Sequence, residues 1–146
     1  MKVLKAILAG FAGAAALNLL HETVRRFDPD APRVDLLGEE ALTHTLNSLN
    51  IKVPKGDNLY AATLLGDLIS NGMYYSAIAM SGQKNIYLKG AAAGLTAGMG
   101  AIQIPEHVGL DDQPVTKTDK TKLLTVAWYL IGGLVTAAVF DRLNKN

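Results

Sequence analysis

The chain has 146 residues, of which 49% are hydrophobic and 18% are charged, and it contains no cysteine. A soluble domain usually carries about 25% charged residues, and the missing cysteine excludes disulfides, thiolate metal sites and a cysteine nucleophile. The formal net charge of +1 gives no footprint for nucleic acid. We therefore expect one small membrane domain over residues 1–146, with no nucleic-acid partner and no cofactor.

Charged residues are sparse in four stretches, each close to the roughly 20 residues that cross a bilayer as a helix. The helices predicted from them cover residues 3–26, 59–80, 86–104 and 122–141. A soluble bundle with apolar helices is the alternative, but such helices normally keep a polar face. The first, third and fourth stretches show no such face. The sequence therefore predicts an all-α integral membrane protein, a bundle of four transmembrane helices.

The first stretch also resembles a secretory signal peptide, because Lys2 and Lys5 precede an apolar run that ends in small residues. Two observations favour a retained helix instead. The helical pattern continues through Arg26, and Gly10 and Gly13 are residues that a packed helix uses. We expect this helix to stay in the protein.

A short amphipathic helix is predicted in the first polar segment, at residues 36–49. Residues 28–32 contain two prolines, which end the first helix. Asp35 is placed as the N-cap of the new helix, which carries Leu42 and Leu46 on one side. Such a helix can lie in the membrane interface or pack on the bundle as a lid. The pattern does not separate the two.

Small residues in the last two stretches predict close helix packing. Gly90, Gly94 and Gly98 stand four residues apart on one face, and such faces let helix backbones approach each other in lipid. The contact can lie within one copy, in a homo-oligomer, or with another membrane protein. Thr116 and Asp119 have the spacing of a capping box that opens the last helix.

Four spans place both chain ends and the turn near residue 83 on one side of the membrane. Lys and Arg are denser there than on the opposite side, which receives residues 21–57 and 105–122. The positive-inside rule then predicts cytoplasmic N and C termini, and we expect a bacterial inner membrane.

A polar pocket is predicted where three helices reach the side opposite the termini. Its candidate residues are Asn18, His21, Glu22, Arg25, Arg26, Asp67, Asn71, Tyr74, Thr125 and Tyr129. Asp67 lies roughly 13 Å into its helix, and a carboxylate at that depth costs at least about 2.5–3.5 kcal/mol. Asp67 must therefore face a partner or water.

Two interpretations of Asp67 remain open. In the first, Asp67 pairs with His21 or Arg25 and fixes helix packing. In the second, it belongs to a water-accessible pocket for a polar ligand, a lipid headgroup or a proton. We also expect Glu22 and Arg26 to form an i,i+4 pair, and Arg25 and Arg26 to contact anionic headgroups.

The catalytic motifs are missing: no phosphate loop and no nucleophile elbow is present. His21, Glu22, His44 and His107 are metal-ligand types without a metal-site spacing, so we expect no metal. The leading hypothesis is a non-enzymatic binding or accessory protein, whose pocket near Asp67 and residues 21–26 contact lipid headgroups or a protein partner. The alternatives are a small oligomeric channel or transporter that uses Asp67 as its ion-coupled group, and a membrane enzyme acting on lipid.

Overall fold

The computed structural model describes residues 1–145, and this range is all-α with no strand. Its helices are α1 (Lys2–Val24), α2 (Val34–Ser48), α3 (Asp57–Met80), α4 (Ile86–His107), α5 (Gln113–Thr116) and α6 (Asp119–Lys145). By length and composition, α1 and α6 are two helices that could cross a membrane. The short α5 has no counterpart among the predicted helices.

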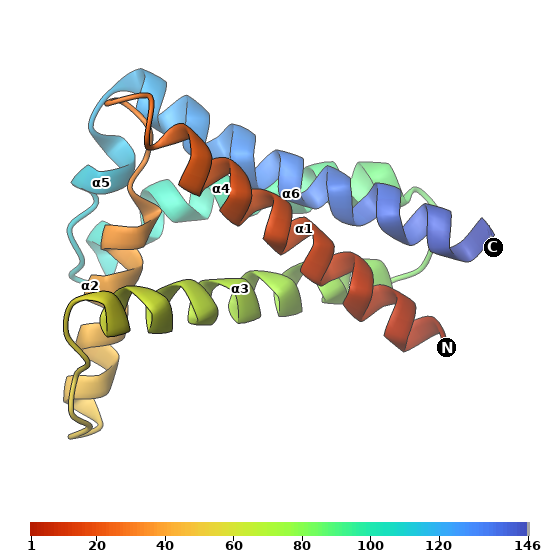
Figure 1. Ribbon diagram of the computed structural model, residues 1–146. Helices are drawn as coiled ribbons and strands as arrows, with labels where there is room; N and C mark the ends of the chain where they lie inside the picture. Colours follow the sequence, from red (N-terminus) through yellow and green to blue (C-terminus); the bar gives the residue numbers. More distant parts are fainter. Residues whose placement is uncertain (146) are drawn as a thin grey trace.

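The four long helices run lengthwise with alternating direction, and α2 crosses them at one end (Figure 1). The two chain ends lie at the opposite end (Figure 1). Helix α1 packs on both α3 and α6, and α6 packs on both α1 and α4. Because α3 and α4 make few contacts with each other, the order of packing is α3, α1, α6, α4, with an open side between the outer two.

Glycines on α1 let it pack closely on both neighbours. A Cβ on Gly10 would lie 2.6 Å from the carbonyl oxygen of Gly72 in α3. A Cβ on Gly13 would overlap the carbonyl of Gly132 in α6. The two helix backbones therefore touch α1 on two faces, and no larger residue fits at either position.

The glycine face of α4 packs against α6. A Cβ built on Gly94 would lie 2.6 Å from the Cα of Leu130, and one on Gly98 would lie 2.7 Å from the Cα of Val126. Gly90 meets the α6 backbone in the same way. This face is therefore covered inside a single copy of the chain.

The start of α6 differs from the prediction. The capping box predicted for Thr116 and Asp119 is wrong, because the reciprocal bonds are made by Thr118 and Thr121. The Thr121 N–H donates to Thr118 Oγ1 at 3.0 Å, and the Thr118 N–H donates to Thr121 Oγ1 at 3.3 Å. The helix begins earlier than predicted, at Asp119.

The end of α4 also differs, since the helix passes through Pro105 and ends at His107 instead of Ile104. A proline removes one N–H donor and leaves the later ones free. The Val108 N–H still donates to the carbonyl of Ile104 at 3.2 Å. A proline this close to the end of a helix therefore does not stop it.

Two lysines hold the carbonyl ends of neighbouring helices at the end of the molecule where the termini lie. The Lys5 ammonium donates to the carbonyl of Leu143 in α6. The Lys89 ammonium donates to the carbonyls of Ser81 at 3.1 Å and Gly82 at 3.3 Å, just after α3. Cations stabilise helix C-termini, where carbonyls lack partners.

Helix α2 packs on the bundle through its first half only. Its first turns pack on α3, because a Cβ on Gly38 would lie only 2.7 Å from Thr63 Cγ2. Its far end projects past α3 (Figure 1), and Leu49 there is 61% exposed. The first half is therefore a lid on the bundle, and the second half is an unpacked amphipathic arm.

Candidate functional site: a buried ion cluster beside an apolar groove

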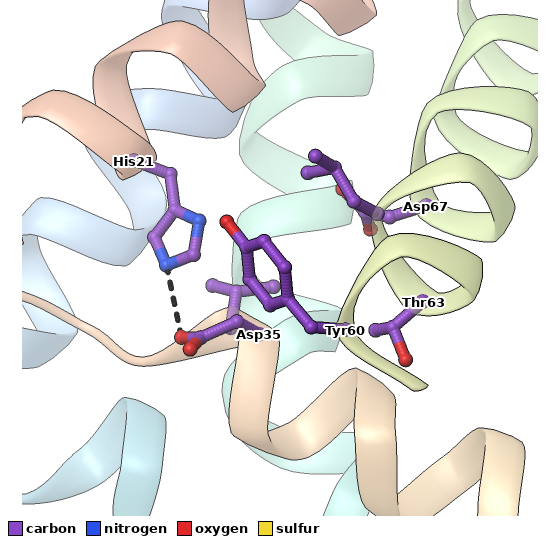
Figure 2. Close-up of a pocket in the computed structure, with 7 residues that line it drawn as sticks. His21, Asp35, Tyr60, Thr63 and Asp67 are labelled. Carbon is purple, nitrogen blue, oxygen red and sulfur yellow. Dashed lines mark ion pairs between the residues drawn. The ribbon is translucent and has the colours of Figure 1, made fainter. Parts of the chain in front are cut away.

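Asp35 is the centre of a cluster of charges where α1, α2 and α3 meet. Its side chain is 5% exposed and lies 2.6 Å from Arg33 Nη2. Arg25 Nη1 and His21 Nε2 each lie 3.4 Å from its carboxylate oxygens. The His21 pair is drawn as a dashed line in Figure 2. One carboxylate of α2 therefore faces three nitrogen-bearing side chains.

Arg25 links this cluster to α1 and α3. Its guanidinium donates to Glu22 at 2.7 Å and to the Tyr60 hydroxyl at 3.1 Å. It also lies 5.5 Å from the centre of the Tyr60 ring, within cation–π range. The predicted pair of Glu22 with Arg26 is wrong, because α1 ends at Val24 and leaves Arg26 exposed beyond the helix.

The cluster shifts the pKa of its members. Burial raises the pKa of Asp35, but hydrogen bonds from Arg33, the Arg33 charge and the nearby His21 ring outweigh burial, so the net pKa lies well below its usual range. The hydrogen bond to Glu22 is the largest cause that raises the pKa of Arg25. The ion pairs of Arg33 with Asp35 and of Arg25 with Glu22 are therefore formed at neutral pH.

The sequence predicts Asp35 as the N-cap of α2, and this prediction is wrong. Arg33 is the N-cap of α2, and Asp35 lies in the first turn with its side chain in the cluster. An acidic residue near the start of a helix is typical of an N-cap, so the sequence pattern did not indicate that Asp35 forms ion pairs. Tyr60 was also missed, although it lies seven residues before Asp67 and so on the same helix face.

A small cavity lies beside the cluster, lined by His21, Asp35, Tyr60, Thr63 and Asp67 together with two aliphatic residues (Figure 2). Its volume is about 10 Å³, close to the minimum that one water molecule requires. Figure 2 shows the Tyr60 ring reaching from α3 toward His21 across this space. The cavity is too small for an organic ligand.

A much larger groove of about 560 Å³ lies on the open side of the bundle, between α3 and α4 and under the first half of α2. Apolar and small residues make most of its walls, among them Leu37, Ala41, Ala97, Gly100, Ala101 and Ile104. Its polar lining residues are Asp67, Ser70, Asn71, Tyr74, Thr96 and Tyr129. The Tyr74 hydroxyl donates to the carbonyl of Ala93 at 2.9 Å and so joins the two helices.

Asp67 lines both the small cavity and the groove. It accepts a hydrogen bond from Asn71 Nδ2 at 2.9 Å. The expected ion pair with Arg25 or His21 is absent from residues 1–145, because those side chains face Glu22 and Asp35. The ion pairs between elements are therefore made by Asp35, and Asp67 lines the groove without an ion-pair partner among residues 1–145.

The predicted pocket residues separate into three groups. The groove takes Asp67, Asn71, Tyr74 and Tyr129. The ion cluster takes His21, Glu22 and Arg25. Asn18, Arg26 and Thr125 line neither the groove nor the cavity, and the Thr125 hydroxyl donates to the carbonyl of Thr121 at 2.9 Å.

Within residues 1–145, no group of three or more His, Asp and Glu side chains is placed to hold a metal ion. His44 and His107 are exposed, and His107 Nδ1 lies 2.7 Å from the carbonyl of Gln103 in its own helix.

No family model, no curated protein and no solved structure matches the chain.

Proposed function

We propose that the chain is an integral membrane protein in which α3 and α4 span the bilayer together with α1 and α6. The support comes from the outward faces of α3 and α4, which expose large apolar side chains along their length. These are Leu65, Ile69, Met73 and Met80 on α3, and Leu88, Leu95 and Met99 on α4. A soluble monomer rarely exposes apolar surface over such an extent, whereas lipid covers it without cost.

The cytoplasmic side in this proposal is the end with the chain termini, in a bacterial inner membrane. Lys2 and Arg142 lie at that end, in the first turn of α1 and the last turn of α6, and Lys84 lies in the turn between α3 and α4. The positive-inside rule counts such residues. The ion cluster and α2 then lie on the opposite face, where the exposed Arg26 is available to lipid phosphates.

We propose a non-enzymatic role for this protein: it binds a membrane amphiphile in the groove between α3 and α4. One observation carries the proposal, which is the combination of mostly apolar walls with Asp67 and Asn71 in a space of about 560 Å³. Ligand sites have this size and this mixture of apolar lining with few polar groups. The groove lies between two helices whose outer faces meet lipid, so a membrane molecule can enter from the bilayer.

The first test asks whether the chain is embedded in the membrane. Membranes holding the protein are washed with alkaline carbonate and then extracted with detergent. We expect the protein to stay in the membrane pellet and to leave it only in detergent. Release by carbonate would contradict the membrane proposal.

The second test asks whether the groove is occupied. Native mass spectrometry of the detergent-purified protein should show a bound amphiphile, and Gly100→Leu should remove it by filling the groove. A Cβ on Gly100 meets only the flexible end of Ile104, so the variant is expected to fold. Gly66→Leu is the matched control, because Gly66 lines no part of the groove and has open space around it. A bound species that is equally abundant in both variants would refute the groove.

Liposome flux distinguishes the transporter alternative. The binding proposal predicts no proton or ion flux from the wild type. Flux that disappears in Asp67→Asn, with folding unchanged, would replace it with a transport function.

A further inference from the structure

Asp67 is the one charged residue among the residues that line the groove. Within residues 1–145 its carboxylate accepts a side-chain hydrogen bond from Asn71 alone. A carboxylate has about four acceptor positions on its two oxygens. Most of the hydrogen-bonding capacity of Asp67 is therefore unused by the described part of the chain.

The basic side chains nearest to Asp67 lie against other carboxylates. Arg25 pairs with Glu22 at 2.7 Å and contacts Asp35 at 3.4 Å. His21 lies between the same two acids, with Nδ1 3.6 Å from Glu22 and Nε2 3.4 Å from Asp35. No Lys, Arg or His of residues 1–145 lies within ion-pair distance of Asp67.

The position of Asp67 makes an unpaired charge expensive. Asp67 lies ten positions after Asp57, the start of α3, which corresponds to about 15 Å along the helix axis. In a membrane-spanning helix, carboxylates at such depth pair with a cation or face water. The partner that the protein does not provide can come from a ligand.

The rest of the groove fits an apolar body next to that charge. Ala97, Ala101 and Ile104 form the α4 wall, and Leu37 of α2 covers one end. Hydroxyl groups of Ser70 and Thr96 also line the groove, and each oxygen can accept a hydrogen bond. A group of hydrogen-bond acceptors in an apolar groove favours a ligand whose polar head group donates hydrogen bonds.

We infer that the groove binds an amphiphilic amine, with its protonated amino group at Asp67 and its hydrocarbon chain along α4. This rests on the proposed function and names its ligand class. An ammonium group supplies three donors and the missing positive charge, so its bond to Asp67 is charge-assisted. A neutral alcohol of the same chain length lacks the charge, and a fatty carboxylate is repelled by Asp67.

The test compares three probes with one chain length: dodecylamine, dodecanol and dodecanoate. The full chain is placed in phosphatidylcholine nanodiscs, and binding of radiolabelled dodecylamine is measured with empty nanodiscs subtracted. Unlabelled dodecylamine should compete at least about tenfold better than dodecanol, with dodecanoate the weakest. This ranking needs only the wild-type protein, so it does not depend on any variant folding.

Variants then assign the selectivity to Asp67. Asp67→Asn should weaken dodecylamine binding by about tenfold or more and leave dodecanol within about threefold. Asp57→Asn makes the same chemical change on the same helix outside the groove and should alter neither.

Two outcomes overturn the inference and separate it from the proposed function. Equal competition by dodecylamine and dodecanol would refute the amine while leaving an amphiphile groove in place. No saturable binding of any probe, with Gly100→Leu indistinguishable from the wild type, would refute both. Amine selectivity that persists in Asp67→Asn would also overturn the assignment to Asp67.

Discussion

Gly94→Ala is the sharpest test of the contact between α4 and α6. The added Cβ would lie 2.6 Å from the Cα of Leu130 and from the carbonyl oxygen of Tyr129, whereas ordinary contact begins at 3.4 Å. Both atoms belong to the backbone and cannot rotate away. The helices must therefore separate by roughly 0.8 Å, which disturbs the packing above and below.

The magnitude follows from two opposing effects. Overpacking of this kind costs about 2–3 kcal/mol, and alanine recovers about 1 kcal/mol through its better helix propensity. We expect a net loss of about 1–2 kcal/mol, which lowers the unfolding midpoint by a few degrees.

The assay is thermal unfolding in detergent, with Gly66→Ala as the control. Gly66 is exposed within α3 and has no atom within 4 Å of an added Cβ. Its substitution should stabilise the protein by about 0.4–1 kcal/mol. If Gly94→Ala were as stable as the wild type, or shifted in the same direction as Gly66→Ala, the close contact with α6 would be wrong.

Two further predictions concern the N-terminal ends of α2 and α6. Asp35→Asn should cost about 2–4 kcal/mol, less than the roughly 3–5 of a fully buried pair because Arg33 is 42% exposed. Since folding lowers the pKa of Asp35, its stabilisation is present above about pH 4, the unfolded pKa, and is lost as the pH falls below it. Unfolding midpoints between pH 7 and pH 3 should fall more steeply for the wild type than for the variant, and parallel profiles would contradict the role of Asp35. Thr118→Ala should cost about 1 kcal/mol as a lost N-cap, and a larger loss in Thr116→Ala would restore the cap predicted from the sequence.

The helices could be predicted because their signals are local. A long apolar run specifies a helix whatever surrounds it, and two prolines in residues 28–32 separate the first two helices. The four-residue α5 carries too few residues to show a period. The C-terminus of α4 and the N-terminus of α6 depend on single hydrogen bonds, which the composition of the sequence does not reveal.

The predictability of the site also depends on whether its contacts are local in the sequence. Asp67 and Asn71 are four residues apart on one helix, so their hydrogen bond needs only helical geometry. The partners of Asp35 come from the end of α1 and from the loop before α2, and they meet only when that loop folds back. The sequence suggested Asp67 as the partner of Arg25. In the folded chain Asp35 lies closer to Arg25 and contacts it instead.

The place of α6 between α1 and α4 has a consequence for the order of events during synthesis. Helices α1, α3 and α4 leave the ribosome before α6, the last of the described helices in chain order. Until α6 arrives, α1 has only α3 as a partner, and the glycine face of α4 has no backbone to meet. These small-residue faces are then uncovered while the middle of the bundle is still absent. Assembly of this bundle is therefore completed at its centre, when α6 packs between α1 and α4.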